Sequence, residues 1–187
     1  KIKLLYEMIK IREVEKTIAN KYPERKMRCP VHLSIGQEAI AVGVCNNLNK
    51  KDQIFSAHRS HDHYLAKGGD LNSMIAELYG KVTGCAMGKG GSMHLIDQSV
   101  GMIAAVPIVG STLPISVGLA WSNKLKNNNN LVVVFFGDGA TEEGVFQESL
   151  DFASLHNLKI LFVCENNYFS VYSNINKRQS PNRKISK

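Results

Sequence analysis

The stretch LVVVFFGDGATEEG, residues 131–144, is an apolar run that stops abruptly at Gly-Asp-Gly. Leu131–Phe136 is continuous, β-branched and aromatic, which is typical of a parallel strand buried on both faces. Asp138 therefore lies just past the carboxyl end of that strand, where open α/β sheets bind their ligands. The alternative is an ordinary loop in which Asp138 only caps the helix that follows.

A second strand follows this stretch. Residues 141–156 have the pattern of a helix, and residues 159–165, KILFVCE, read as a strand that ends in Asn166-Asn167. Strand, helix and strand make a βαβ unit, whose two strands run parallel and whose crossover is expected to be right-handed. We therefore expect Asp138 and Asn167 at the same edge of one sheet.

The residue types at this edge suit a metal-bound diphosphate. A carboxylate and an amide oxygen are hard ligands for Mg²⁺, which usually shares its six oxygens with substrate phosphates. The helix start near Thr141 would add a positive N-terminus beside the phosphates, and Arg59 could add a charged fork. The alternative is that Asn166-Asn167 is only a turn dipeptide. Because Asn-Asn follows Gly-Asp-Gly across a βαβ unit, the pattern favours the metal–diphosphate site.

The rest of the chain alternates helices with short extended segments. Helices are expected over residues 1–20, over 35–48 after a capping box at Ser34–Gln37, over 71–79 between Asp70 and Gly80, and over 111–126. Gln53–Ala57 reads as a strand, residues 84–92 as a glycine-rich loop, and residues 98–110 as irregular or briefly extended.

These elements indicate an α/β fold, a parallel sheet flanked by helices. We expect one domain over residues 1–187, with an N-terminal helical arm of about residues 1–30. Only three or four strands are recognisable, which is few for a doubly wound sheet. The sequence therefore predicts a fold truncated at its C-terminus.

Composition and charge narrow the classes of protein to which this chain could belong. The 187 residues are 44% hydrophobic and 21% charged, with a net charge of +7, as expected of a soluble globular protein. The basic clusters at 21–28 and 177–187 lack a nucleic-acid motif, and no apolar run approaches the roughly 20 residues of a membrane span. The N-terminus lacks the apolar core of a signal peptide. Four cysteines without C-x-x-C spacing fit reduced thiols, in the cytoplasm or in a mitochondrial matrix after leader removal.

Taken together, the motifs resemble the α subunit of two-subunit, thiamine diphosphate-dependent 2-oxoacid dehydrogenases. The resemblance covers about residues 5–175, and its pyruvate and acetoin types look closer than the branched-chain type. The motifs are GDGATEEG, FVCENN, HLSIGQEAIAVG, HYLAKGGDL, ELYGK, GKGGSMHL and PIVGS.

The resemblance implies a role for each matching residue, and His61 is added to them as a second catalytic candidate. Thiamine diphosphate and Mg²⁺ would be the cofactors, with the metal held by the Asp138 carboxylate, the Asn167 amide and the Phe169 carbonyl. His32 would face the reacting carbon of the substrate, and His61 would handle a proton or orient groups near the diphosphate. The remaining cofactor contacts would come from His58, Arg59, Pro107, Val109, Gly139 and Ala140.

The resemblance also implies partners and a substrate. The chain would be active only with a β subunit, in an α₂β₂ assembly, and would pass an acyl group from a small 2-oxoacid, most simply pyruvate, to a lipoyl-bearing acyltransferase. Acetoin or branched-chain substrates, and a noncatalytic anion-binding relative, stay open. Pro107 stands where related chains usually have Gly, and related subunits continue past residue 187 into a loop with a second histidine. A zinc site at His58, His61 and His63 is disfavoured by their spacing.

Overall fold

The computed structural model describes residues 1–185, and the chain divides into two units, Lys1–Pro107 and Ile108–Lys187. Each unit is described by itself. Residues 186–187 of the expected domain lie outside the described residues. One domain over residues 1–187 stays a prediction.

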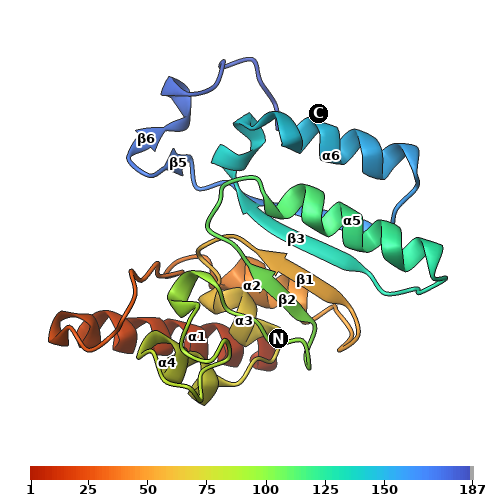
Figure 1. Ribbon diagram of the computed structural model, residues 1–187. Coiled ribbons are helices and arrows are strands. Elements are labelled where there is room, and N and C mark those ends of the chain that lie inside the picture. Colours follow the sequence, from red (N-terminus) through yellow and green to blue (C-terminus); the bar gives the residue numbers. More distant parts are fainter. Residues whose placement is uncertain (186–187) are drawn as a thin grey trace. The chain divides into compact units, whose positions relative to one another are not determined.

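The first unit combines helices with a parallel strand pair. Helices α1, α2 and α3 pack together, and β1 pairs with β2 in parallel, from Ile54 opposite Met102 to Ser56 opposite Ala105 (Figure 1). The elements are α1 (Ile2–Lys21), η1 (Tyr22–Glu24), α2 (Glu38–Cys45), β1 (Gln53–Ser56), α3 (His61–Ala66), α4 (Leu71–Leu78), η2 (Gly91–Met93) and β2 (Met102–Ala105).

Several expected elements of this unit are confirmed. The apolar stripe of α1 buries Ile11 and Ile18 completely or nearly so. Asp70 caps α4, because its Oδ2 accepts a hydrogen bond of 2.7 Å from the Ser73 amide. The extended part of residues 98–110 is the short strand β2.

The capping box expected at Ser34 is wrong. Helix α2 begins at Glu38, and the Ser34 hydroxyl is instead 2.9 Å from the Asp62 carboxylate. The Glu38 carboxylate accepts the Gly36 amide at 3.1 Å, and α2 has no side-chain cap at its N-cap residue, Gln37. The short helix α3 was not expected, because its residues, HDHYLA, are mostly polar yet almost entirely buried.

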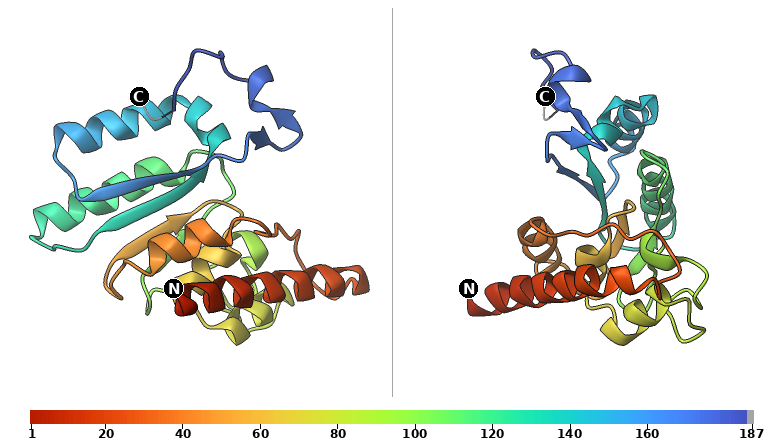
Figure 2. Two further views of the ribbon diagram at one scale, coloured as in Figure 1. Left: turned by 180° about the vertical axis from the view of Figure 1, so that it is seen from behind. Right: turned by 90° about the vertical axis from the view of Figure 1, so that its left-hand side faces the viewer.

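The second unit is built on the stretch that opened the sequence. Strands β3 and β4 are parallel, from Val132 opposite Ile160 to Gly137 opposite Glu165. Helices α5 and α6 lie on the same face of this pair (Figures 1 and 2). The elements are α5 (Thr112–Leu125), β3 (Val132–Gly137), η3 (Asp138–Glu142), α6 (Gly144–Leu155), β4 (Ile160–Glu165), β5 (Phe169–Ser170), β6 (Ser173–Asn174) and η4 (Ile175–Lys177).

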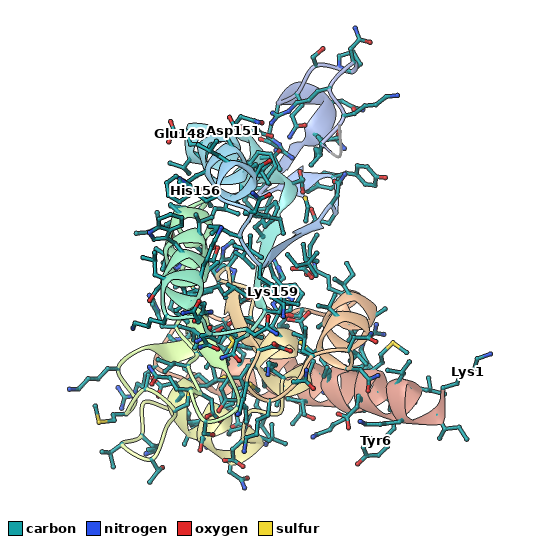
Figure 3. All side chains as sticks on the ribbon, turned by 90° about the vertical axis from the view of Figure 1, so that its right-hand side faces the viewer. Lys1, Tyr6, Glu148, Asp151, His156 and Lys159 are labelled. Carbon is teal, nitrogen blue, oxygen red and sulfur yellow. The ribbon has the colours of Figure 1, made fainter. Side chains whose placement is uncertain are left out.

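The core of this unit forms where the helices cover β3. Residues 132–136 are all buried, as the apolar run predicts, and the ring centroid of Phe136 lies 5.6 Å from that of Phe146 in α6. The Trp121 ring of α5 packs edge to face against the rings of Phe152 in α6 and of His156, the residue that follows α6 and is labelled in Figure 3. No helix among residues 1–185 is long and apolar enough to cross a bilayer.

One boundary here differs from the expectation. The helix expected from residue 141 begins at Gly144, because Asp138–Glu142 forms the 3₁₀ helix η3. The positive N-terminus of α6 therefore does not begin at Thr141. The hairpin of β5 and β6 was also not expected, since its strands are two residues each and largely exposed.

The Arg12–Glu38 pair predicts how stability depends on pH. The Arg12 guanidinium donates to Glu38 at 2.5 and 2.9 Å, and these hydrogen bonds lower the pKa of the Glu38 carboxyl from 4.5 to about 2. A lowered folded-state pKa stabilises the fold above pH 4.5, and that stabilisation is lost as the pH falls toward 2. Glu38→Gln should therefore unfold at a lower urea concentration than the native chain at pH 7. The difference between the two urea midpoints should become smaller below pH 4.5.

Glu13→Gln is the matched control. Glu13 lies on the same helix as Arg12, but its pair with Lys16 is exposed on both sides. An exposed pair contributes little to stability, so the control should stay near the native midpoint at both pH values. A difference in urea midpoint between Glu38→Gln and the native chain that does not change with pH would contradict the prediction.

Candidate active site

The carboxyl ends of β3 and β4 meet at one edge. The register pairs Gly137 with Glu165, the last residues of the two strands. Asp138 follows the first strand directly, and Asn167 stands two residues past the second. The expectation that this carboxylate and this amide share one edge of a parallel pair is confirmed.

The turn after β3 touches the loop after β4. A Cβ built on Gly139 would lie 2.7 Å from the Ser170 hydroxyl oxygen and 3.1 Å from the Ser170 Cβ. Glycine therefore favours the close approach, because a side chain at residue 139 would force Ser170 to shift. Phe169, whose carbonyl is an expected metal ligand, precedes Ser170 in the short strand β5. Ala140 is buried at 3% exposure within η3.

Asp138 has one oxygen paired and one oxygen unpaired. The residue is 1% exposed, and its Oδ2 accepts a 2.5 Å hydrogen bond from Arg178 Nη2. Its Oδ1 is buried and has no hydrogen-bond partner among residues 1–185. An unsatisfied buried carboxylate oxygen is costly, so this atom is suited to a ligand that supplies positive charge.

Asn167 lies at the same edge of the strand pair, in a tightly turned loop. Its Oδ1 accepts the Phe169 amide at 2.9 Å, and Tyr168 between them has φ of 66°. The Tyr168 carbonyl is used by the Ile175 amide at 2.7 Å. An amide oxygen has two acceptor sites, so the Asn167 oxygen retains capacity for a cation. The donor set of carboxylate, amide and backbone carbonyl fits Mg²⁺, which prefers oxygen ligands.

Three expected residues of the first unit come together. The ring centroids of His32 and His58 are 4.9 Å apart, with the rings edge to face. An Arg59 Nη1 donates to the Leu33 carbonyl, next to His32 in the chain. Burial, followed by the charge of Arg59, lowers the pKa of His32 below 6.5. The pKa of His58 is also lowered, by burial first and then by His32 and Arg59. Both rings are therefore mainly neutral at pH 7.

His61 occupies a different environment. Its ring is 0% exposed, with Nδ1 2.6 Å from Glu15 Oε1 and Nε2 2.8 Å from Ser92 Oγ. Both ring nitrogens are therefore engaged inside the first unit. Of the two roles expected for His61, this environment favours orienting other groups over handling a proton.

Pro107 and Val109 lie between β2 and α5, outside regular structure. Val109 is 45% exposed, and Pro107 is half-buried. Their backbone contacts to the cofactor stay predictions.

The backbone amides of the glycine-rich loop surround a carboxylate of the same chain. The Glu77 carboxylate accepts hydrogen bonds of 2.7–3.0 Å from the amides of Ala86, Gly88, Gly90 and Gly91. Burial raises the pKa of Glu77, but the four amides outweigh it and leave the pKa below 4.5. Converging amides of this kind often bind phosphate. Here they bind a carboxylate of the chain itself.

Sequence reasoning missed Glu15, Glu77 and Arg178. The first two carried a signal, because each places a charge on the apolar stripe of an amphipathic helix. Glu15 lies four residues after Ile11, and Glu77 lies three residues after Met74. Arg178 carried none, since it belongs to a basic, irregular segment.

Comparison with known proteins gives consistent matches. The family described as dehydrogenase E1 component matches residues 6–186. The α subunit of an acetoin:2,6-dichlorophenolindophenol oxidoreductase from Bacillus subtilis is 45% identical, covering 86% of this chain and 48% of that protein. The mitochondrial pyruvate dehydrogenase E1 component subunit alpha of Chaetomium thermophilum is 39% identical over 90% of this chain and 40% of its own length. The Rickettsia prowazekii pyruvate dehydrogenase E1 component subunit alpha is 37% identical over 93% and 53%.

The histidine pair makes a prediction about titration. In NMR pH titrations, His32 and His58 should both titrate below pH 6.5. Arg59→Gln should raise both pKa values, because removal of a nearby positive charge favours the imidazolium form. Arg25→Gln removes an exposed charge of the same unit and should leave both values in place. Titration of both rings at or above pH 6.5 in the native chain would contradict the assignment.

The contact at Gly139 predicts a steric cost. Gly139→Ala should destabilise the fold by about 1–3 kcal/mol in urea unfolding, as overpacking usually does. Gly137→Ala is the control, because a Cβ there meets nothing within 4 Å. Ser170→Gly should restore part of the loss, since it removes both clashing atoms. Equal stability of the two alanine variants would show that the turn and the loop are not in contact.

Proposed function

The chain belongs to the dehydrogenase E1 component family, and on this premise we propose that it is part of the α subunit of a thiamine diphosphate-dependent 2-oxoacid dehydrogenase. Pyruvate is the proposed substrate, and a lipoyl group on a separate acyltransferase is the proposed acceptor. The chain spans about half the length of the curated relatives it matches. The activity therefore belongs to the longer α subunit together with a β subunit, in an α₂β₂ assembly.

One observation carries the proposal. The buried Oδ1 of Asp138 lacks a hydrogen-bond partner within residues 1–185, at the edge where Asn167 and Phe169 also lie. Mg²⁺ would satisfy this oxygen, and the diphosphate would complete the coordination. The other oxygen stays paired with Arg178, which keeps the carboxylate oriented. An ordinary capping role is disfavoured, because Asp138 stands inside η3 and the N-cap residue of the helix that follows, α6, is Glu143.

The other residues have distinct proposed roles. When bound, thiamine diphosphate supplies the nucleophilic carbon and the electron sink for decarboxylation. Arg59 and His58 bind the diphosphate, with the backbone of Gly139 and Ala140 as further donors. Pro107 and Val109 hold the aminopyrimidine through their backbone. His32 is suited to proton transfer near neutral pH, since its lowered pKa keeps one ring nitrogen free to accept a proton.

Acetoin oxidation is a second candidate. The identity to the Bacillus subtilis acetoin subunit is 45%, against 37–39% for the pyruvate dehydrogenase subunits above. Both reactions would use the same metal and cofactor residues.

The cysteines bear on the compartment. All four cysteines are free thiols, which suits a reducing compartment such as the cytoplasm or the mitochondrial matrix.

Calorimetric titration tests the metal site. Thiamine diphosphate is titrated, with and without Mg²⁺, into the full-length α subunit co-expressed with its β subunit. Asp138→Asn should abolish the Mg²⁺-dependent part of the affinity, because a ligand and its charge are lost together. The loss should exceed the roughly 10–100-fold that removal of an outer-shell partner costs. Asp151→Asn, an exposed residue of α6, is the control (Figure 3).

The results separate the candidates. Metal-dependent binding followed by turnover of pyruvate supports the main proposal, and turnover of acetoin alone supports the second. Unchanged metal dependence in Asp138→Asn would refute the metal assignment. A well-folded complex that binds no thiamine diphosphate would refute the proposed function.

A further inference from the structure

The segment that carries His32 has no secondary structure to hold it. Residues 31–34 belong to neither a helix nor a strand, so their backbone groups need other partners. The His32 amide donates to Ser92 Oγ at 3.3 Å, and the Ser34 amide donates to Glu15 Oε2 at 2.5 Å. The Leu33 carbonyl between them accepts from Arg59. Side chains therefore hold three consecutive residues by their backbone.

The two side chains that bind these amides are connected through His61. Glu15 Oε1 is 2.6 Å from His61 Nδ1, and Ser92 Oγ is 2.8 Å from His61 Nε2. Glu15 and His61 are 0% exposed, and Ser92 is 1% exposed. The three residues come from α1, α3 and η2, so they join three elements that are distant in sequence.

The hydrogen bonds have one consistent direction when the imidazole is neutral. A carboxylate only accepts, so His61 donates its Nδ1–H to Glu15. Nε2 is then an acceptor, and the Ser92 hydroxyl donates to it. Ser92 Oγ accepts the His32 amide in turn. The charge of Glu15 thus fixes the tautomer of His61, and through it the orientation of the Ser92 hydroxyl.

Acid, histidine and serine in this order resemble a nucleophilic triad. Nucleophilic attack by Ser92 is excluded by its burial, since a substrate cannot reach a hydroxyl that is 1% exposed. The plain alternative is a buried polar network that only specifies the fold. Both ends of this network, however, bind amides within two residues of each other, on either side of Leu33. A role in holding His32 explains that arrangement.

We propose that Glu15, His61 and Ser92 form a positioning relay, which fixes residues 32–34 and so holds His32 in its working position. The inference rests on the proposed function, because it takes His32 as the group that acts on the substrate. His61 is then a positioning residue and not a catalytic one. Arg59 is coupled to the relay through the Leu33 carbonyl.

The test uses the full-length α subunit co-expressed with its β subunit. Ser92→Ala removes one hydroxyl and keeps the fold's volume, and Glu15→Gln removes the charge that fixes the tautomer. Glu13→Gln on the same helix is the control, since Glu13 is exposed. Hydrogen exchange of peptides covering residues 30–36 is measured without substrate. Turnover and thiamine diphosphate affinity are then measured in each variant, alone and combined with His32→Ala.

We expect exchange of residues 30–36 to accelerate at least about tenfold in Ser92→Ala and Glu15→Gln, as local opening becomes easier. Turnover should fall by about 10–100-fold, since misplacement of a reacting group has effects of this size. Cofactor affinity should change by less than about threefold. The fall in turnover should disappear in the His32→Ala background, because positioning residues act through their target.

Several results would overturn the relay. Native exchange rates in a folded Ser92→Ala variant would show that the hydroxyl does not hold the segment. Faster exchange with native turnover would show that the segment need not be held. A turnover loss that persists in the His32→Ala background would indicate a general loss of structure. If His32→Ala alone has native turnover, the proposed role of His32 fails, and the exchange data still decide whether the relay holds the segment.

Discussion

A carboxylate can be buried in a protein only if other groups compensate for its lost hydration. This constraint organises the irregular parts of the chain. Glu15 is buried against a histidine ring and the Ser34 amide, and Glu77 is buried against four amides of the glycine-rich loop. In both cases the carboxylate stands on a helix, and its partners include backbone amides that belong to no helix or strand. The need to satisfy the charge therefore fixes segments that no strand or helix would fix.

For Asp138 the lost hydration is compensated only in part. Arg178 satisfies one of its oxygens, and the other is buried without a partner among residues 1–185. Glu15 and Glu77 serve structure, because each is surrounded by donors from the chain. Asp138 differs from these two, because one of its oxygens has no donor among residues 1–185, and a bound cation would satisfy that oxygen. The number of donors thus distinguishes Glu15 and Glu77 from Asp138, the carboxylate proposed for binding.

Sequence reasoning predicted the structure correctly where burial follows a simple pattern of apolar residues. The run Val132–Phe136 is apolar without interruption, and it forms the buried strand that the pattern predicts. Parallel pairing then places Asp138 and Asn167 at the same edge, so that part of the site could be predicted from the sequence alone. The relation of His32 to His58 could not be derived in this way. It depends on contacts between residues 26 positions apart, and no periodic pattern encodes such contacts.

The errors have identifiable physical causes. Ser34 has the spacing of a capping residue, but a buried aspartate competes for its hydroxyl and the helix begins later. Helix α3 was missed because its polar residues are buried by hydrogen bonding, whereas pattern reading assumes that buried residues are apolar. Glu15 interrupts an apolar stripe in a helix that was otherwise correctly predicted.

A charge on the buried stripe of an amphipathic helix is therefore informative in itself. Such a residue lowers the hydrophobic contribution of the helix and must be compensated by partners elsewhere in the fold. Where those partners include backbone amides of an irregular segment, the charge also determines where that segment lies. In this chain both stripe carboxylates have such partners, and one of the segments carries His32. The sequence thus contains the positions of the supporting residues, although only the structure identifies what each one supports.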